Sequence, residues 1–212
     1  DEGYPVVDIY VQNLNSSGNS VLEENGKQIC STGKTQIEPT INKTSDGKIF
    51  ISWASGSNEY MKDSISYQIL NEEGTELLPV NGTAIINGIS GNVSNDLEVI
   101  ENGNFPIIVW GDNRFESNQQ LYFQITDPNG NVIHNPNGIT VTDNTNSAQY
   151  DIDVTKYPDS DEFAVIWKEN RYGFNYQAYA QIINTDGTMV GPPEGILLST
   201  AEVMDQVFTS IS

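Results

Sequence analysis

Three tryptophans lie at equal intervals in this chain of 212 residues, and their spacing constrains the fold more than any other feature. Trp53, Trp110 and Trp167 are 57 residues apart. Three further sets of residues keep nearly the same interval, which indicates that one unit is repeated along the whole chain. These sets are Gln12, Gln68, Gln124 and Gln181; Gly18, Gly74, Gly130 and Gly187; and Gly26, Gly82, Gly138 and Gly195.

Each unit has the pattern of four short strands. A polar alternating segment comes first, an apolar segment ending in Trp comes second, and a Tyr/Gln segment and a short apolar segment follow. Gly, Asn, Asp and Pro separate these segments, and no helical period is present. The pattern predicts an all-β chain, a β-propeller built of four-stranded antiparallel blades. A β-sandwich is the competing fold, but it does not explain why four sets of residues recur at the same interval.

We expect a single propeller module over residues 1–212. Residues 1–32 would be the end of a blade, 33–88, 89–144 and 145–200 would be complete blades, and 201–212 would be the first strand of a next blade. Three accounts of this arrangement stay open: a piece of a longer propeller, a four-bladed ring with one incomplete blade, or a ring completed by a partner's strand.

The charge balance excludes several partners. Acidic residues number 29 and basic residues 9, so the net charge is −20, which would repel nucleic acid and anionic membranes. No apolar run is long enough to span a membrane as a helix. Cys30 is the only cysteine and His134 the only histidine. A Cys/His nucleophile pair would therefore require these two residues to meet. A zinc site built of His and Cys ligands is excluded, because it needs three or four of them. We expect Cys30 to be packed rather than reactive.

Two of the Trp strands continue into the same polar motif. Trp110-Gly111-Asp112-Asn113-Arg114 is followed by Tyr122-Phe123-Gln124, and Trp167-Lys168-Glu169-Asn170-Arg171 is followed by Tyr179-Ala180-Gln181. These residues resemble the tandem W-x-D-x-R…Y-x-Q…G repeat of propellers in secreted bacterial surface proteins. The resemblance implies an extracellular or cell-surface location. The unit of Trp53 departs from it, because Ala54–Asn58 contains neither the acid nor the Arg.

The acid–Arg pairs in this motif have two interpretations. Asp112 with Arg114 and Glu169 with Arg171 could bind a sugar or a carboxylate beside an aromatic ring. Their recurrence in successive units favours structural ion pairs that fix the turn after the Trp strand. We therefore expect the repeated Trp, Gln, acid and Arg residues to serve blade packing.

Carboxylates recur in the first strand of each unit, which lines the central channel of a propeller. They are Glu38, Asp96, Glu98, Asp151 and Asp153. A ring of carboxylates would attract Ca²⁺, which prefers oxygen ligands. The alternative is a polar, water-filled channel without an ion.

Aromatic residues follow the Trp strands and are expected on one rim of the ring, where sugars could stack on them. They are Tyr60, Phe115, Tyr172, Phe174 and Tyr176.

Function is less constrained than fold. The repeat, the acidic surface and the lack of a catalytic motif favour a non-enzymatic extracellular module for adhesion or surface assembly, with protein partners joined through open strand edges. The alternative is a carbohydrate-binding, lectin-like propeller. A glycoside hydrolase with an acidic site in the channel is a third hypothesis, because that chemistry needs only two carboxylates.

Overall fold

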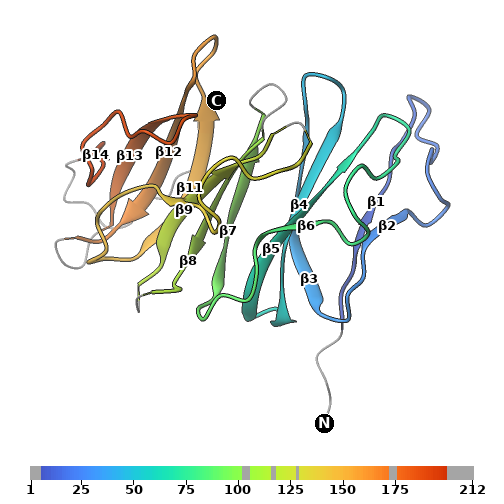
Figure 1. The fold of residues 1–212 in the computed structure, drawn as a ribbon, viewed down its shortest axis with the longest axis horizontal. Helices are drawn as coiled ribbons and strands as arrows, with labels where there is room; N and C mark the ends of the chain where they lie inside the picture. Colours follow the sequence, from blue (N-terminus) through green and yellow to red (C-terminus); the bar gives the residue numbers. More distant parts are fainter. Residues whose placement is uncertain (1–5, 102–105, 116–117, 128, 172–175, 200–212) are drawn as a thin grey trace.

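The computed structural model describes residues 6–101, 106–115, 118–127, 129–171 and 176–199. These residues form four antiparallel sheets that follow one another across the molecule (Figure 1). Three of the sheets have four strands joined in chain order, and the sheet formed by β1 and β2 has two. The prediction of an all-β propeller with four-stranded antiparallel blades is confirmed.

The strand bounds follow the repeat. The two-stranded sheet contains β1 (Ile9–Val11) and β2 (Lys27–Cys30); the next contains β3 (Thr35–Lys43), β4 (Ile49–Asn58), β5 (Met61–Leu70) and β6 (Thr83–Ile86); the third contains β7 (Val93–Ile100), β8 (Ile107–Asp112), β9 (Gln120–Ile125) and β10 (Ile139–Thr140); the last contains β11 (Gln149–Lys156), β12 (Glu162–Glu169), β13 (Gln177–Asn184) and β14 (Ile196–Leu197). Each four-stranded sheet lies inside one of the units 33–88, 89–144 and 145–200. The expected strand at 207–211 lies outside the described residues.

The apolar core lies between neighbouring sheets. Each Trp is fully buried and belongs to the cluster shared with the preceding sheet: Trp53 packs with Ile9 and Ile29, Trp110 with residues of β4 to β6, and Trp167 with residues of β8 and β9. A large aromatic side chain therefore fills each wedge between blades.

The repeated glutamines fasten the segment that follows the third strand of each blade. Gln124 is fully buried, and its side-chain oxygen accepts hydrogen bonds from the backbone N–H groups of Ile125 and His134 at 2.9 and 3.1 Å. Its amide donates to the Asn135 carbonyl at 3.0 Å. Gln12 and Gln68 make the same kinds of contact, and Gln181 bonds the backbone of Ile182 and Pro192. Because one amide satisfies several backbone groups, Gln is required at this position for structural reasons.

The acid–Arg pairs contact the tryptophans. Trp110 Nε1 donates to Asp112 at 2.8 Å, Arg114 Nε donates to the same carboxylate at 2.8 Å, and the Arg114 guanidinium lies 4.2 Å from the centre of the Tyr122 ring. In the next blade Trp167 Nε1 donates to Glu169 at 2.9 Å, and Arg171 lies 3.8 Å from the Tyr179 ring. Both carboxylates are fully buried, so these pairs are part of blade packing rather than an open binding site.

The blade of Trp53 lacks this arrangement. Ser55 stands where the other blades have the acid, so Trp53 Nε1 lacks the carboxylate acceptor that Trp110 and Trp167 have. Cys30 lies in the same cluster and is buried. Burial, followed by the negative charge of Asp8, raises the pKa of the Cys30 thiol to about 11, so the thiol stays protonated at neutral pH.

The first strand of each four-stranded sheet lies at one edge of that sheet, and these edge strands meet. β7 lies against both β3 and β11, which places the expected channel residues of three blades side by side. None of the described residues forms a helix long and apolar enough to cross a membrane.

Candidate functional site

A bulge interrupts each inner strand at the level of the Trp. In β3, Ile37 pairs with Ala54 and Thr40 with Ser52, so Glu38 and Pro39 face one partner residue. In β11, Asp151 and Ile152 are the extra pair in the same way. In β7, residues 94–96 are inserted between the pairs Val93–Asp112 and Leu97–Trp110. Bulges re-aim side chains and occur often beside active sites.

Two of the bulged residues have a backbone conformation that is rare outside glycine. Glu38 has φ 56° and Asp151 has φ 51°. Such a conformation costs roughly 1–2 kcal/mol at a non-glycine residue. The strain recurs at the same position of two blades, and both strained residues line one pocket.

The three bulges bring Glu38, Asp96 and Asp151 to the wall of one pocket of about 480 Å³. All three side chains are half-buried. Tyr60 and Tyr150 line the same pocket. The pocket therefore combines carboxylates from three successive blades with aromatic rings, which is a surface suited to a small polar ligand with apolar faces.

Among the three carboxylates, Asp96 has the most hydrogen-bond donors around it. Its Oδ2 accepts a hydrogen bond from Gln119 Nε2 at 2.8 Å, and its Oδ1 accepts one from the backbone N–H of Asp151 at 3.1 Å. Ser94 Oγ lies 3.3 Å from Oδ2 and accepts from the Asp96 backbone N–H at 3.1 Å. These donors fix the orientation of the Asp96 carboxylate and link two blades.

Each flanking carboxylate pairs with a lysine. Lys62 Nζ lies 2.8 Å from Glu38 Oε1, and the Lys62 side chain is only 1% exposed. Glu38 Oε2 is buried and has no hydrogen-bond partner among the described residues. Asp151 forms an ion pair with Lys168, and the hydrogen bond to Asp151 raises the pKa of Lys168. The pocket wall therefore carries positive as well as negative groups.

Glu98 and Asp153 lie further along the inner strands. Glu98 is an exposed residue, but partial desolvation of its carboxyl, followed by the negative charges of Asp153 and Asp96, raises its pKa. A carboxyl with a raised pKa near other carboxylates is a common feature of acid–base sites.

The raised pKa of Glu98 predicts a pH-dependent stability. A Glu whose pKa is raised on folding stabilises the protein fully below its unfolded pKa, and this contribution is lost as the pH rises through the folded value. We expect Glu98→Gln to melt at a higher temperature than the wild type at pH 7, with the difference shrinking towards pH 4. Thermal melts at the two pH values test this. The exposed turn variant Glu24→Gln should show no such pH-dependent gain, and a gain that is equal at both pH values would contradict the assignment to Glu98.

The carboxylates named as a candidate calcium ring do not form a metal-ligand cluster among the described residues. No group of three or more His, Cys, Asp or Glu side chains within the described ranges is arranged to hold a metal ion. Two of the five channel carboxylates named from the sequence are instead paired with lysines, and a third is held by amide and backbone donors.

The described aromatic residues expected on one rim do not all lie at one site, although Tyr60 and Tyr176 are both close to the carboxylate pocket. Tyr60 lines the carboxylate pocket, whereas Phe115 is 79% exposed and borders a different opening with Arg114 and Tyr122. Tyr176 packs edge-on against Tyr150, with ring centres 6.3 Å apart. Tyr172 and Phe174 lie outside the described residues.

Sequence reasoning missed the polar and aromatic pocket residues Glu59, Lys62, Asn92, Ser94, Gln119 and Tyr150. The sequence does carry a signal for Lys62, because basic residues are rare in this chain. Lys62 also follows the one Trp strand that lacks an acid–Arg pair. The others carry no signal in the repeat, because their positions depend on how loops of neighbouring blades meet.

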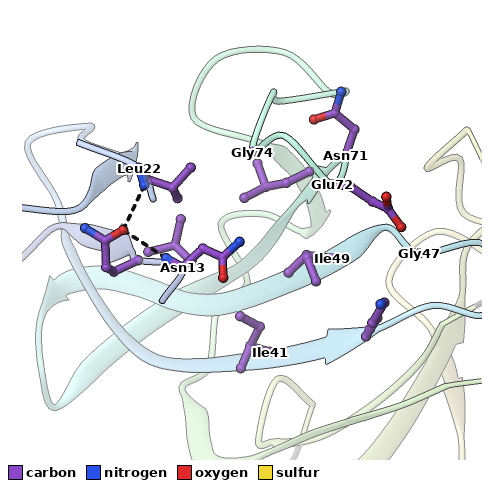
Figure 2. Close-up of a pocket in the computed structure, with 12 residues that line it drawn as sticks. Asn13, Leu22, Ile41, Gly47, Ile49, Asn71, Glu72 and Gly74 are labelled. Carbon is purple, nitrogen blue, oxygen red and sulfur yellow. Dashed lines mark hydrogen bonds between the residues drawn. The ribbon is translucent and has the colours of Figure 1, made fainter. Parts of the chain in front are cut away.

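A second pocket lies between the two-stranded sheet and the β3–β6 sheet. Figure 2 shows Ile41 and Ile49 on adjacent strands, with Leu22 and Gly74 nearby. Ile41 is 60% exposed, whereas Val99 and Val154, at the same place in the next two inner strands, are 4% and 5% exposed. This pocket is a gap between blades with aliphatic and polar walls, and Glu72 is the one carboxylate among the described residues that line it.

Comparisons with known proteins support the fold and correct the expected function. No protein-family model and no curated protein matches the chain. Among solved structures it is similar to a GH93 α-L-arabinofuranosidase of Fusarium graminearum in complex with arabinobiose, with 13% identity and a TM-score of 0.50 over 83% of this chain and 64% of that one. It is also similar to an α-L-arabinanase of Penicillium chrysogenum complexed with arabinobiose, with 14% identity and a TM-score of 0.51 over 90% of this chain and 66% of that one.

The chain thus spans less than two thirds of the length of these two proteins. At this identity the likeness establishes the fold. The matched propellers are enzymes that act on arabinose-containing glycans, so the expectations of a non-enzymatic chain and of an adhesion or assembly module are contradicted. The comparisons favour the carbohydrate alternative, and nothing in them points to protein partners.

Proposed function

We propose that this chain forms the acidic site of a carbohydrate-active propeller, which binds an arabinose-containing glycan at the channel mouth and hydrolyses a glycosidic bond in it. The observation that carries the proposal is the convergence of Glu38, Asp96 and Asp151, placed by three consecutive strand bulges around one pocket with two tyrosines. Glycosidic hydrolysis requires a pair of carboxyl groups, one protonated and one ionised. The arabinobiose complexes of two similar propellers support this substrate class.

Asp96 is suited to act as the ionised partner. Hydrogen bonds from Gln119 and from the Asp151 backbone fix the orientation of its carboxylate. In the proposed reaction Asp96 removes a proton from water as the water oxygen attacks the anomeric carbon.

Glu98 is suited to act as the protonated partner. It lies two residues after Asp96 in β7, and the negative charge of Asp96 contributes to its raised pKa. Its raised pKa increases the protonated fraction near neutral pH. Glu98 would donate its proton to the glycosidic oxygen as the bond between that oxygen and the anomeric carbon breaks.

Glu38 and Lys62 are suited to hold the sugar. The buried Oε2 of Glu38 is an unsatisfied acceptor among the described residues, and a sugar hydroxyl that donated to it would remove the cost of that unmade hydrogen bond. Lys62 fixes the other oxygen of the same carboxylate at 2.8 Å. These two residues therefore serve binding rather than proton transfer in this proposal.

Substitution of Asp96 tests the catalytic step. We expect Asp96→Asn to lower kcat/KM by at least about a hundredfold, because removal of a general base typically costs that much, while glycan binding is retained. The measurement is arabinose release from arabinan and from a 4-nitrophenyl α-L-arabinofuranoside, together with calorimetric titration of arabinobiose. Asp186→Asn, an exposed change in the β13–β14 connection, should leave both unchanged.

Other outcomes would decide against parts of the proposal. Binding of arabinobiose without any hydrolysis by the wild type would refute the catalytic step and leave the carbohydrate-binding alternative. Absence of both binding and hydrolysis would refute the proposed function.

A further inference from the structure

The two strands of the β4–β5 hairpin are longer than the corresponding strands of the next two blades. β4 and β5 have ten residues each, whereas β8 and β9 have six and β12 and β13 have eight. The additional pairs of residues between β4 and β5 extend the sheet to a two-residue turn, Glu59-Tyr60. The pairing of Asn58 with Met61 closes this turn. Glu59 and Tyr60 line the carboxylate pocket, so the extra length reaches the candidate site.

The tip of this hairpin is held by the next blade. Asn92 Nδ2 donates to the Tyr60 carbonyl at 2.8 Å, and Asn92 Oδ1 accepts from the Lys62 backbone N–H at 2.7 Å. Asn92 is itself fixed, because its backbone N–H donates to Asn113 Oδ1 at 2.6 Å. Within the turn, Asn58 Oδ1 accepts from the Tyr60 N–H at 2.9 Å. The backbone that carries Tyr60 is therefore bound on both sides of the tip.

The Tyr60 side chain remains open to solvent although its backbone is fixed. It is 67% exposed and lies on the wall of the pocket that contains Glu38, Asp96 and Asp151. A large aromatic ring exposed at a fixed position offers an apolar face at low entropic cost to a ligand. Carboxylates and lysines bind sugar hydroxyls, whereas an aromatic face packs against the C–H face of a sugar ring.

We propose that the Tyr60 tip is a second sugar subsite, and that the channel-mouth site takes an arabino-oligosaccharide of at least two residues. One residue would occupy the carboxylate end, and the next would pack on the Tyr60 ring. The inference rests on the proposed function for its substrate class. Asn92 is a positioning residue in this scheme, because it holds the tip without contributing an aromatic surface.

Length-dependent binding tests this inference in the intact protein. Calorimetric titrations would compare L-arabinose, arabinobiose and arabinotriose against the wild type and three variants. We expect Tyr60→Ala to weaken binding of the two oligosaccharides by about tenfold and to leave the affinity for L-arabinose unchanged. Tyr60→Phe should bind like the wild type, since the ring is kept. Asn92→Ala should weaken oligosaccharide binding less than Tyr60→Ala, because the ring is present but its position is no longer fixed.

Phe115→Ala is the matched control. Phe115 is also an exposed aromatic residue, but it borders the opening formed with Arg114 and Tyr122 rather than the carboxylate pocket. Its removal should not change the affinity for any of the three sugars. A loss with Phe115→Ala and not with Tyr60→Ala would overturn the assignment of the subsite.

A second readout separates the subsite from the proposed reaction. Tyr60→Ala should lose about tenfold in kcat/KM on arabinotriose, whereas Tyr60→Phe should lose little, since the ring is kept. Equal kcat/KM losses for Tyr60→Ala and Tyr60→Phe would overturn the subsite, as would equal oligosaccharide affinities of Tyr60→Ala and the wild type. Failure of the proposed reaction would appear instead as absent turnover in the wild type, with the length-dependent binding still present.

Discussion

Replacement of Arg114 by alanine is expected to lower the free energy of unfolding by about 3–5 kcal/mol, the usual cost of breaking a buried ion pair. Asp112 is fully buried, and the Arg114 side chain is 6% exposed. Without Arg114, the Asp112 carboxylate would be a buried charge with the Trp110 indole N–H among its few remaining donors. Urea denaturation followed by tryptophan fluorescence would measure the loss.

Two comparisons make this prediction specific. Lys34 pairs with Asp63 at 3.0 Å, but both side chains are more than a third exposed, so Lys34→Ala should cost less than about 1 kcal/mol. The double variant Asp112→Asn with Arg114→Ala should be more stable than Arg114→Ala alone, because the amide removes the unpaired charge. Equal losses for Arg114→Ala and Lys34→Ala would show that the buried pair is not important for blade packing.

Gly138→Ala is expected to lower the free energy of unfolding by about 2–4 kcal/mol, from a strained backbone and an overpacked contact. Gly138 has φ 83°, and a Cβ there would meet the Trp110 ring and lie 2.8 Å from the Phe123 carbonyl oxygen. The Phe123 oxygen belongs to the backbone, and Trp110 is enclosed between blades, so neither can move freely. Thermal or urea denaturation of the variant measures this effect.

Gly88→Ala is the control for the backbone contribution. Gly88 also has positive φ, at 64°, but nothing lies within 4 Å of the Cβ position. It should therefore show only the conformational cost of about 1 kcal/mol. If the two alanine variants were equally stable, close packing of Gly138 on Trp110 would not explain why this glycine recurs in the repeat.

The repeat made the blade architecture predictable because it reflects contacts inside one unit or with the adjacent one. Trp110, Asp112 and Arg114 touch one another within five residues of chain, and Gln124 bonds a loop ten residues away. Such local contacts must be rebuilt in every blade, so the same residue types return at the same interval. The expected ion-pair role of Asp112 and Arg114 agrees with these contacts.

The candidate site was less predictable because its members come from different blades. Asp96 accepts a hydrogen bond from the backbone of Asp151, 55 residues away, and Lys62 donates its backbone N–H to Asn92, 30 residues away. Among 29 acidic residues, no pair could be selected by spacing. This is why the hydrolase was the least favoured hypothesis from the sequence, although the acidic inner strands had been identified.

The sequence by itself determined the strands, their order in each blade and the tryptophan wedges, because alternation, turn residues and the 57-residue period are local properties of the chain. Only the tertiary structure decided which carboxylates meet. The bulges at Glu38, Asp96 and Asp151 depend on how each inner strand pairs with its neighbour, and the burial of Lys62 and the fixed tip at Tyr60 depend on the next blade. A repeat encodes what every blade needs, whereas a site between blades is formed by the residues in which they differ.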